Sequence, residues 1–377
     1  MAKAPTKSGS LAQRMKATAN SPYAVLMGED DDRFEIKEWF DTGNLLLNAL
    51  ISSDPYKGVP GGKIIQLAGP NSVGKTYFCL ELLKATQRAG YFNVLYDSEF
   101  ANNNKQDLVK RGLDLDNLLW VGIDIVERLK TSVINQLDEI QDGEKVAMMI
   151  DSIGNLSTLK ETTDSADGND KKDMTRAQQL KALFRTCTLK AGIKGVPMFL
   201  VNHVYAVVGS NVPTNQVGGG SGSLYMSSII LELSKAQDKN ADGEIVGTWI
   251  TCKSVKNRFA RERQKVKVNI NFSEGLQRYS GLFEFFYDEE EVFTRAGNYY
   301  KNPWTDHSLL KKDFTPEVWD KILDAGGADY LRKRFAYQSD AAGILDDDEP
   351  TPELLTEEKP KKRKGGIIIE SDGTPEE

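Results

Sequence analysis

The sequence predicts an α/β fold whose β-sheet is mostly parallel and ends in antiparallel strands. Apolar runs of strand length alternate with helical segments, the pattern of a parallel sheet covered by helices on both sides. Two runs, 146–150 (VAMMI) and 196–201 (VPMFLV), contain no charged or hydrogen-bonding side chain, as in strands buried on both faces. Three more strands with shorter connections lie between residues 227 and 272, which predicts antiparallel pairing there.

Local patterns justify the single elements. The leucines from Leu45 to Leu50 cluster at helical spacing, which predicts one helix. Gly90 follows the helix expected at 76–88 and ends it. Asp173 and Gly192 are the expected cap and end of another helix. In chain order, we expect helices at 11–17, 43–51, 76–88, 127–140 and 173–191, and strands at 63–68, 92–97, 118–123, 146–150, 196–201, 227–233, 248–254 and 265–272.

Composition divides the chain into four parts. Residues 1–35 are an N-terminal arm with a short helix, basic over residues 1–20 and expected to serve polymerisation, and residues 36–280 are the α/β core. The aromatic-rich residues 281–340 predict a small C-terminal lobe, and the acidic residues 341–377 a disordered tail. From residue 344 onward, eleven Asp and Glu stand against five Lys and Arg, so −6 of the net charge of −7 lies in the tail. A basic arm on a nearly neutral body is compatible with a polyanionic partner.

The composition also excludes several classes of protein. No apolar stretch approaches the roughly 18 residues that span a bilayer, so we expect no membrane partner. The three cysteines are far apart, without a CxxC spacing, and the chain has two histidines. Neither a disulfide framework nor a zinc site is therefore indicated, and a reducing cytoplasm fits best.

The strongest motif is a phosphate-binding loop. The segment Gly69-Pro70-Asn71-Ser72-Val73-Gly74-Lys75-Thr76 fits GxxxxGK[ST] between a predicted strand and a predicted helix. Glycines let backbone N–H groups wrap a phosphate, and the helix N-terminus favours its negative charge. The lysine can reach the β- and γ-phosphates, and the threonine hydroxyl can ligate Mg²⁺. The motif predicts binding of a nucleoside triphosphate.

Two acidic residues follow neighbouring apolar strands. Asp151 comes directly after VAMMI, where a magnesium-positioning acid is expected. Glu99, in Tyr96-Asp97-Ser98-Glu99-Phe100, follows the end of the strand expected at 92–97. It is the best candidate to orient an attacking water. A strand-end cap for Asp151 and a surface carboxylate for Glu99 are the alternatives.

A long uncharged stretch is the candidate DNA contact. Residues 195–231 contain no Asp, Glu, Lys or Arg in a chain that is 27% charged. Gly218, Gly219 and Gly220 could offer N–H groups to phosphates, and Val207 and Val208 could insert between bases. A flexible surface loop is the alternative.

A second polar segment, 161–170, is expected to be a loop that leads into the helix carrying Arg176. Arg176 and the nearby Lys181 could contact phosphates. A solvated helix face is the other interpretation.

Several motifs together resemble RecA-type DNA strand-exchange proteins, most closely those of bacteriophages. They are GPNSVGKT, YDSEF, the strand end IDS at 150–152, VNH at 201–203 and the glycine-rich loop, and the resemblance covers roughly residues 40–300. It implies a RecA-type P-loop ATPase core, with ATP and Mg²⁺ as cofactors. It also implies that Glu99 activates water, that Asp151 is the magnesium acid and that His203 senses the γ-phosphate.

The resemblance gives roles to three further regions. Val208-Gly209 matches the apolar residue and glycine of the second DNA-binding loop. Lys256 and Arg258 match two basic residues that reach the ATP of the adjacent protomer. The segment 101–106 departs from the family because it lacks the aromatic residue expected to stack on adenine.

The implied function is ATP-dependent homologous recombination. The chain would form helical filaments on single-stranded DNA, catalyse pairing and strand exchange with double-stranded DNA, and hydrolyse ATP under DNA stimulation. A mediator and a single-strand-binding protein are expected partners, in the host cytoplasm if a phage encodes the chain. A hexameric helicase of the same fold and a non-catalytic, nucleotide-gated recombination mediator are the alternatives.

Overall fold

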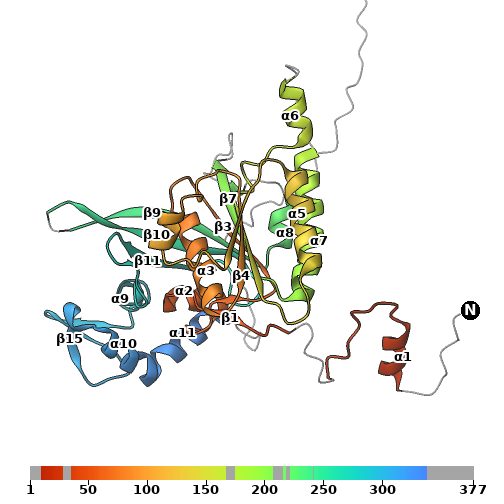
Figure 1. Ribbon diagram of the computed structural model, residues 1–377. Coiled ribbons are helices and arrows are strands. Elements are labelled where there is room, and N and C mark those ends of the chain that lie inside the picture. Colours follow the sequence, from red (N-terminus) through yellow and green to blue (C-terminus); the bar gives the residue numbers. More distant parts are fainter. Residues whose placement is uncertain are drawn as a thin grey trace, which may run out of the picture. The chain divides into compact units, whose positions relative to one another are not determined.

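The computed structural model describes residues 10–28, 35–166, 175–206, 215–217, 221–240 and 242–337. Its main sheet has the strand order β12-β11-β10-β9-β3-β7-β6-β4-β5, and β8 pairs with β7. Figure 1 labels six strands of this sheet, β11, β10, β9, β3, β7 and β4. The strands β9, β3, β7, β6, β4 and β5 are parallel to one another, whereas β8, β10, β11 and β12 pair antiparallel. The bounds are β3 Ile64–Gly69, β4 Phe92–Asp97, β5 Leu118–Gly122, β6 Val146–Asp151, β7 Met198–Ala206, β8 Asn215–Val217, β9 Ile229–Lys239, β10 Ile245–Asn257, β11 Lys265–Asn271 and β12 Gly275–Leu276. The predicted α/β class with a parallel sheet and antiparallel end strands is confirmed.

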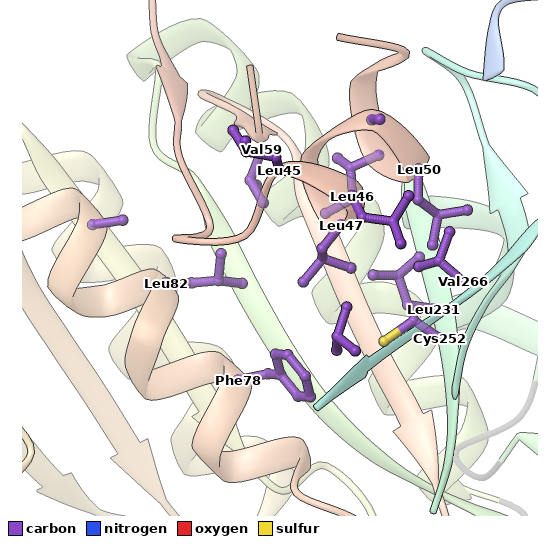
Figure 2. Packing of buried hydrophobic residues seen from close by; sticks show 14 of the residues in the cluster. Leu45, Leu46, Leu47, Leu50, Val59, Phe78, Leu82, Leu231, Cys252 and Val266 are labelled. Carbon is purple, nitrogen blue, oxygen red and sulfur yellow. The ribbon is translucent and has the colours of Figure 1, made fainter. Parts of the chain in front are cut away.

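Helices cover both faces of this sheet. On one face, α2 (Leu45–Ser52) and α3 (Lys75–Arg88) bury leucines and Phe78 against β9, β10 and β11 (Figure 2). On the other face, α5 (Val126–Glu139) and α7 (Thr175–Lys194) pack on the apolar side chains of β6 and β7. The unbroken apolar sequence of β6 follows from this arrangement, since successive side chains enter two different cores.

Helix α2 is fixed at its start by a buried asparagine. The Asn44 Oδ1 accepts a hydrogen bond from the Leu47 N–H at 2.9 Å, and its Nδ2 donates to the carbonyls of Gln277 and Ser280, both at 2.9 Å. One side chain therefore caps the helix and ties it to the turn after β12.

The aromatic-rich C-terminal segment forms small elements around stacked rings. Phe286 and Phe293 stack with centroids 5.2 Å apart, and Trp319 packs on both. These rings belong to the same hydrophobic cluster as the α2 leucines. The elements are α9 Leu282–Glu284, η1 Phe285–Glu289, β13 Thr294–Ala296, β14 Tyr299–Lys301, β15 Ser308–Leu310, η2 Lys311–Asp313, α10 Pro316–Ile322, η3 Leu323–Gly327 and α11 Ala328–Phe335.

Shorter elements complete the described chain. The strands β1 and β2 pair antiparallel, and α8 packs against α7 so closely that a Cβ on Gly222 would lie 2.9 Å from the Lys181 Cα. The bounds are α1 Leu11–Thr18, β1 Trp39–Phe40, β2 Val59–Pro60, α4 Lys105–Lys110, α6 Leu159–Ala166 and α8 Ser221–Met226. None of the helices in the described ranges is long and apolar enough to cross a membrane.

Two local expectations were wrong. The segment expected as a polar loop from residue 161 is helical up to Ala166, because Thr158 and Glu161 cap it reciprocally: the Glu161 N–H donates to the Thr158 Oγ1 at 3.0 Å, and the Thr158 N–H donates to the Glu161 carboxylate at 2.9 Å. Helix α7 does not stop before Gly192 but runs to Lys194, and Gly195, at φ 69°, follows its end. The expected cap Asp173 lies outside the described residues.

Candidate nucleotide-binding site

The phosphate-binding loop connects the carboxyl end of β3 to the start of α3. Ser72 (φ 58°) and Gly74 (φ 96°) adopt left-handed backbone conformations within it, and such residues in a tight turn direct successive N–H groups toward one point. At Gly69 a Cβ would lie 2.7 Å from the Leu233 carbonyl oxygen, so only glycine fits where the loop leaves the sheet. The loop is therefore shaped for an anion at the N-terminus of a helix of 14 residues.

Lys75 carries the positive charge of this loop. Its side chain is buried, and its Nζ donates to the carbonyls of Gly69 at 2.9 Å and Pro70 at 2.7 Å. Burial lowers the pKa of this ammonium, while the nearby carboxylates of Asp151 and Glu99 oppose the change. Both hydrogen-bond partners of the Lys75 ammonium are neutral carbonyls. A phosphate oxygen, which carries negative charge, is therefore a suitable additional partner.

Thr76 and Asp151 form a pair of oxygen donors beside the loop. The Thr76 Oγ1 donates to the Asp151 Oδ2 at 2.7 Å, and the Asn102 Nδ2 donates to the same oxygen at 3.1 Å. Burial raises the pKa of Asp151 to about 6, and the charges of Glu99 and Asp97 add to this effect.

A hydroxyl and a buried carboxylate at this distance suit Mg²⁺, which takes few protein oxygens and completes its shell with water and substrate phosphates. The described residues hold no cluster of three or more His, Cys, Asp or Glu side chains able to bind a metal on their own. The donor set therefore fits a magnesium nucleotide rather than a cation held by protein alone.

Glu99 lines the cavity next to the phosphate-binding loop. Its Oε1 accepts hydrogen bonds from the Ser152 Oγ at 3.0 Å and the Asn155 Nδ2 at 2.9 Å, and the His203 Nε2 lies 3.4 Å away. The imidazole of His203 packs on Gly154, where a Cβ would approach its Cδ2 to 2.6 Å. Glu99, Ser152 and His203 thus connect the ends of β4, β6 and β7.

One cavity brings most of the predicted site together. It has a volume of about 840 Å³ and is lined by residues 70–76 of the loop with Glu99, Asp151, Asn155, Val201, His203 and Val204. Parallel strands end at one edge of a sheet, which explains why the carboxyl ends of β3, β4, β6 and β7 meet here. The predicted residues Lys75, Thr76, Glu99, Asp151 and His203 all lie in or beside this cavity.

Lys256 and Arg258 do not lie in this cavity. Lys256 is opposite Ile230, which is opposite Gln66 near the amino end of β3. Its Nζ donates to the Tyr225 carbonyl at 2.9 Å, and the Arg258 N–H donates to the Ser228 carbonyl at 3.2 Å. Both basic residues therefore belong to the sheet edge opposite the phosphate-binding loop.

The candidate DNA-binding residues are mostly beyond the described ranges. Val207, Val208 and Gly209 follow β7, and Gly218, Gly219 and Gly220 precede α8; all six lie outside the described residues. Arg176 is described, and its guanidinium donates to the carbonyls of Ile153, at 3.1 Å, and Gly154. This contact supports the loop on which His203 packs.

Sequence reasoning missed the residues that hold the site in place. Asp97 is fully buried and accepts hydrogen bonds from the Glu99 N–H at 3.0 Å, the Asn102 N–H at 2.7 Å and the Trp120 Nε1 at 3.2 Å. Ser152 and Asn155 were missed as partners of Glu99. Asp97 had a usable signal, since it is a charged residue ending an apolar strand. Ser152 belongs to the IDS motif at 150–152, and Asn155 follows three residues later, but neither had been given a role.

The fold and this cavity define a P-loop nucleoside-triphosphate-binding protein with a mostly parallel sheet. A family model described as the RecA N-terminal domain matches residues 15–277. The chain belongs to the RecA family, and membership makes it a nucleotide-binding ATPase.

Relatives of known identity agree with this assignment. The recombination and repair protein of Enterobacteria phage T4 is 30% identical over 275 residues, covering 72% of this chain and 69% of the relative. Protein RecA of Bacteroides thetaiotaomicron is 26% identical over 287 residues, covering 76% and 84%. Protein RecA of Paracoccus denitrificans is 26% identical over 276 residues, covering 73% and 74%. The resemblance seen in the sequence motifs is confirmed.

Proposed function

We propose that the chain is an ATP-dependent recombinase that forms helical filaments on single-stranded DNA and catalyses pairing and strand exchange with duplex DNA. The observation that carries the proposal is the cavity in which Lys75, Thr76, Asp151 and Glu99 meet at one sheet edge. Membership of the RecA family and the printed names of the relatives, which include a recombination and repair protein, support it.

Each residue of the cavity has a chemical task. Lys75 binds phosphate oxygens with its ammonium, and Thr76 and Asp151 would hold the magnesium ion. When bound, magnesium ATP supplies the phosphoanhydride bond that is broken and the neutralisation of its charge. Glu99 accepts a hydrogen bond from the attacking water and so orients it toward the γ-phosphate.

The site is completed by a second protomer. Lys256 and Arg258 lie at the sheet edge opposite the loop, so neither reaches the phosphates of its own chain without a change of fold. A head-to-tail assembly brings one edge of a protomer to the opposite edge of the next, and it forms an open helical filament where the rotation between protomers does not close into a ring. In that arrangement the two cations neutralise charge developing on the neighbour's nucleotide.

ATP acts as a switch for DNA binding in this proposal. His203 contacts Ser152 and Glu99 from β7, and the chain leaves β7 toward Val207, Val208 and Gly209. A change at the γ-phosphate would be transmitted through His203 to this segment and to Gly218–Gly220, which would then bind the strand, and Arg176, in α7, would be a further DNA contact. A mediator and a single-strand-binding protein in a cytoplasmic setting complete the proposal.

The helicase and mediator alternatives differ in measurable ways. Purified protein is incubated with ATP, with and without single-stranded DNA, and phosphate release is measured. DNA-stimulated hydrolysis supports the recombinase, and absence of hydrolysis supports a non-catalytic mediator. Electron microscopy of the same samples distinguishes helical filaments from the closed rings of a hexameric helicase.

A further inference from the structure

The carboxylate of Glu99 is held on one of its two oxygens. Within the described residues three side chains contact it, Ser152, Asn155 and His203, and all three reach Oε1. The Glu99 side chain lines the cavity and is 34% exposed. Rotation of a free glutamate about its terminal bond is soft, so these donors fix the orientation of the carboxylate and with it the direction in which the second oxygen faces another partner.

Asn155 differs from the other two donors in what it contacts. The Ser152 Oγ also lies 3.3 Å from the His203 Nε2, so Ser152 and His203 contact each other as well as Glu99. The Asn155 Nδ2 donates to Glu99 at 2.9 Å from the segment after β6, and Asn155 lines the nucleotide cavity. An uncharged amide donor orients a carboxylate without neutralising it, which preserves its ability to accept from water.

We propose that Asn155 is a positioning residue for ATP hydrolysis: its amide holds the Glu99 Oε1 and leaves the second carboxylate oxygen to orient the attacking water. The proposal deepens the proposed ATPase function and rests on it. Asn155 lies within the range of the resemblance, but neither the motifs nor the resemblance gave it a role. The contact joins the ends of β4 and β6, so it exists only where the two strand ends meet.

Two substitutions separate orientation from packing. Asn155→Ala removes the donor, and Asn155→Asp keeps the shape but replaces the donor with a second carboxylate facing the Glu99 Oε1. Removing a hydrogen bond to a charged group that stabilises the transition state lowers kcat by about tenfold or more. We expect kcat of the DNA-stimulated ATPase to fall about tenfold in Asn155→Ala and further in Asn155→Asp, with KM and nucleotide affinity within about twofold of wild type.

The control variants use the same chemistry elsewhere. Asn298→Asp makes the same change in charge at an exposed position between β13 and β14, away from the nucleotide cavity, and it should keep the wild-type rate. In a Glu99→Gln background, adding Asn155→Ala should change the single-turnover rate less than twofold, because the oriented carboxylate is already absent.

The outcomes distinguish this inference from the proposed function. If wild-type protein hydrolyses no ATP with single-stranded DNA, the proposed function and the inference fail together. If the wild type is active but Asn155→Asp equals it, or Asn155→Ala leaves kcat unchanged, the positioning role is overturned and the ATPase stands. A loss of nucleotide binding parallel to the loss of kcat also overturns it.

Discussion

Replacing Asp151 with asparagine should stabilise the free protein while abolishing its activity. Asp151 is 3% exposed, and burial raises its pKa from 3.8 to about 6. The unfolded chain ionises above pH 3.8 while the folded chain keeps the proton up to about pH 6, so the free energy of unfolding falls with rising pH across this window. The difference of about two pKa units corresponds to about 3 kcal/mol at pH 7.5.

The same relation fixes how the effect depends on pH. Below pH 3.8 both states are protonated and the ionisation cost vanishes, whereas at pH 5 it is about half of its value at pH 7.5. Asparagine remains neutral and keeps an oxygen to accept from the Thr76 hydroxyl. The gain of Asp151→Asn in unfolding free energy should therefore rise from pH 4 to pH 6 and then level off at no more than about 3 kcal/mol.

Urea unfolding of both proteins in buffer with EDTA and without nucleotide measures this gain. Adding magnesium and a non-hydrolysable ATP analogue should then stabilise the wild type more than Asp151→Asn, because binding to the folded state adds to stability. A variant that is less stable than the wild type at pH 7.5, or a difference independent of pH, would refute the reasoning.

Two further predictions concern the turn after β4 and the second protomer. Trp120→Phe removes the indole hydrogen bond to Asp97 and should lower the unfolding free energy by about 1–2 kcal/mol in urea titrations. It should also lower kcat, because Asp97 shapes the turn that carries Glu99. An unchanged kcat would show that this hydrogen bond does not position Glu99. Arg258→Ala and Lys75→Ala should each lose DNA-stimulated ATPase. In an equal mixture, a site is complete where one protomer keeps Lys75 and its neighbour keeps Arg258, which random assembly gives at about a quarter of the sites. The mixture should therefore recover about a quarter of the wild-type rate. No recovery in mixtures that co-assemble would contradict a site shared between protomers.

The elements that surround the site could be predicted from sequence because each has a local cause. A strand, a glycine-rich turn and a helix follow one another at 64–88, and the apolar runs of β4 and β6 end at acidic residues. Parallel strands end at one edge, so the sequence alone predicts Glu99 and Asp151 near the phosphate-binding loop. Helix α6 also has a local cause, since Thr158 and Glu161 have capping-box spacing, and a polar composition does not exclude a capped helix.

Other features depend on the tertiary path of the chain and leave little mark on the sequence. The contact between Asn155 and Glu99 requires the segment after β6 to turn back across the end of β4. Arg176 is a residue type that commonly binds phosphate, but its guanidinium donates to the carbonyls of Ile153 and Gly154. Whether an arginine contacts a phosphate or a backbone carbonyl depends on the fold around it.

Strand exchange between homologous single-stranded and duplex DNA, measured with the wild type and with Lys75→Ala, tests the central claim most directly. The account predicts that the wild type converts duplex and single strand into exchanged product in the presence of ATP, and that Lys75→Ala neither hydrolyses ATP nor yields product. Exchange by Lys75→Ala at the wild-type rate would contradict the claim that the triphosphate held by this loop controls DNA binding.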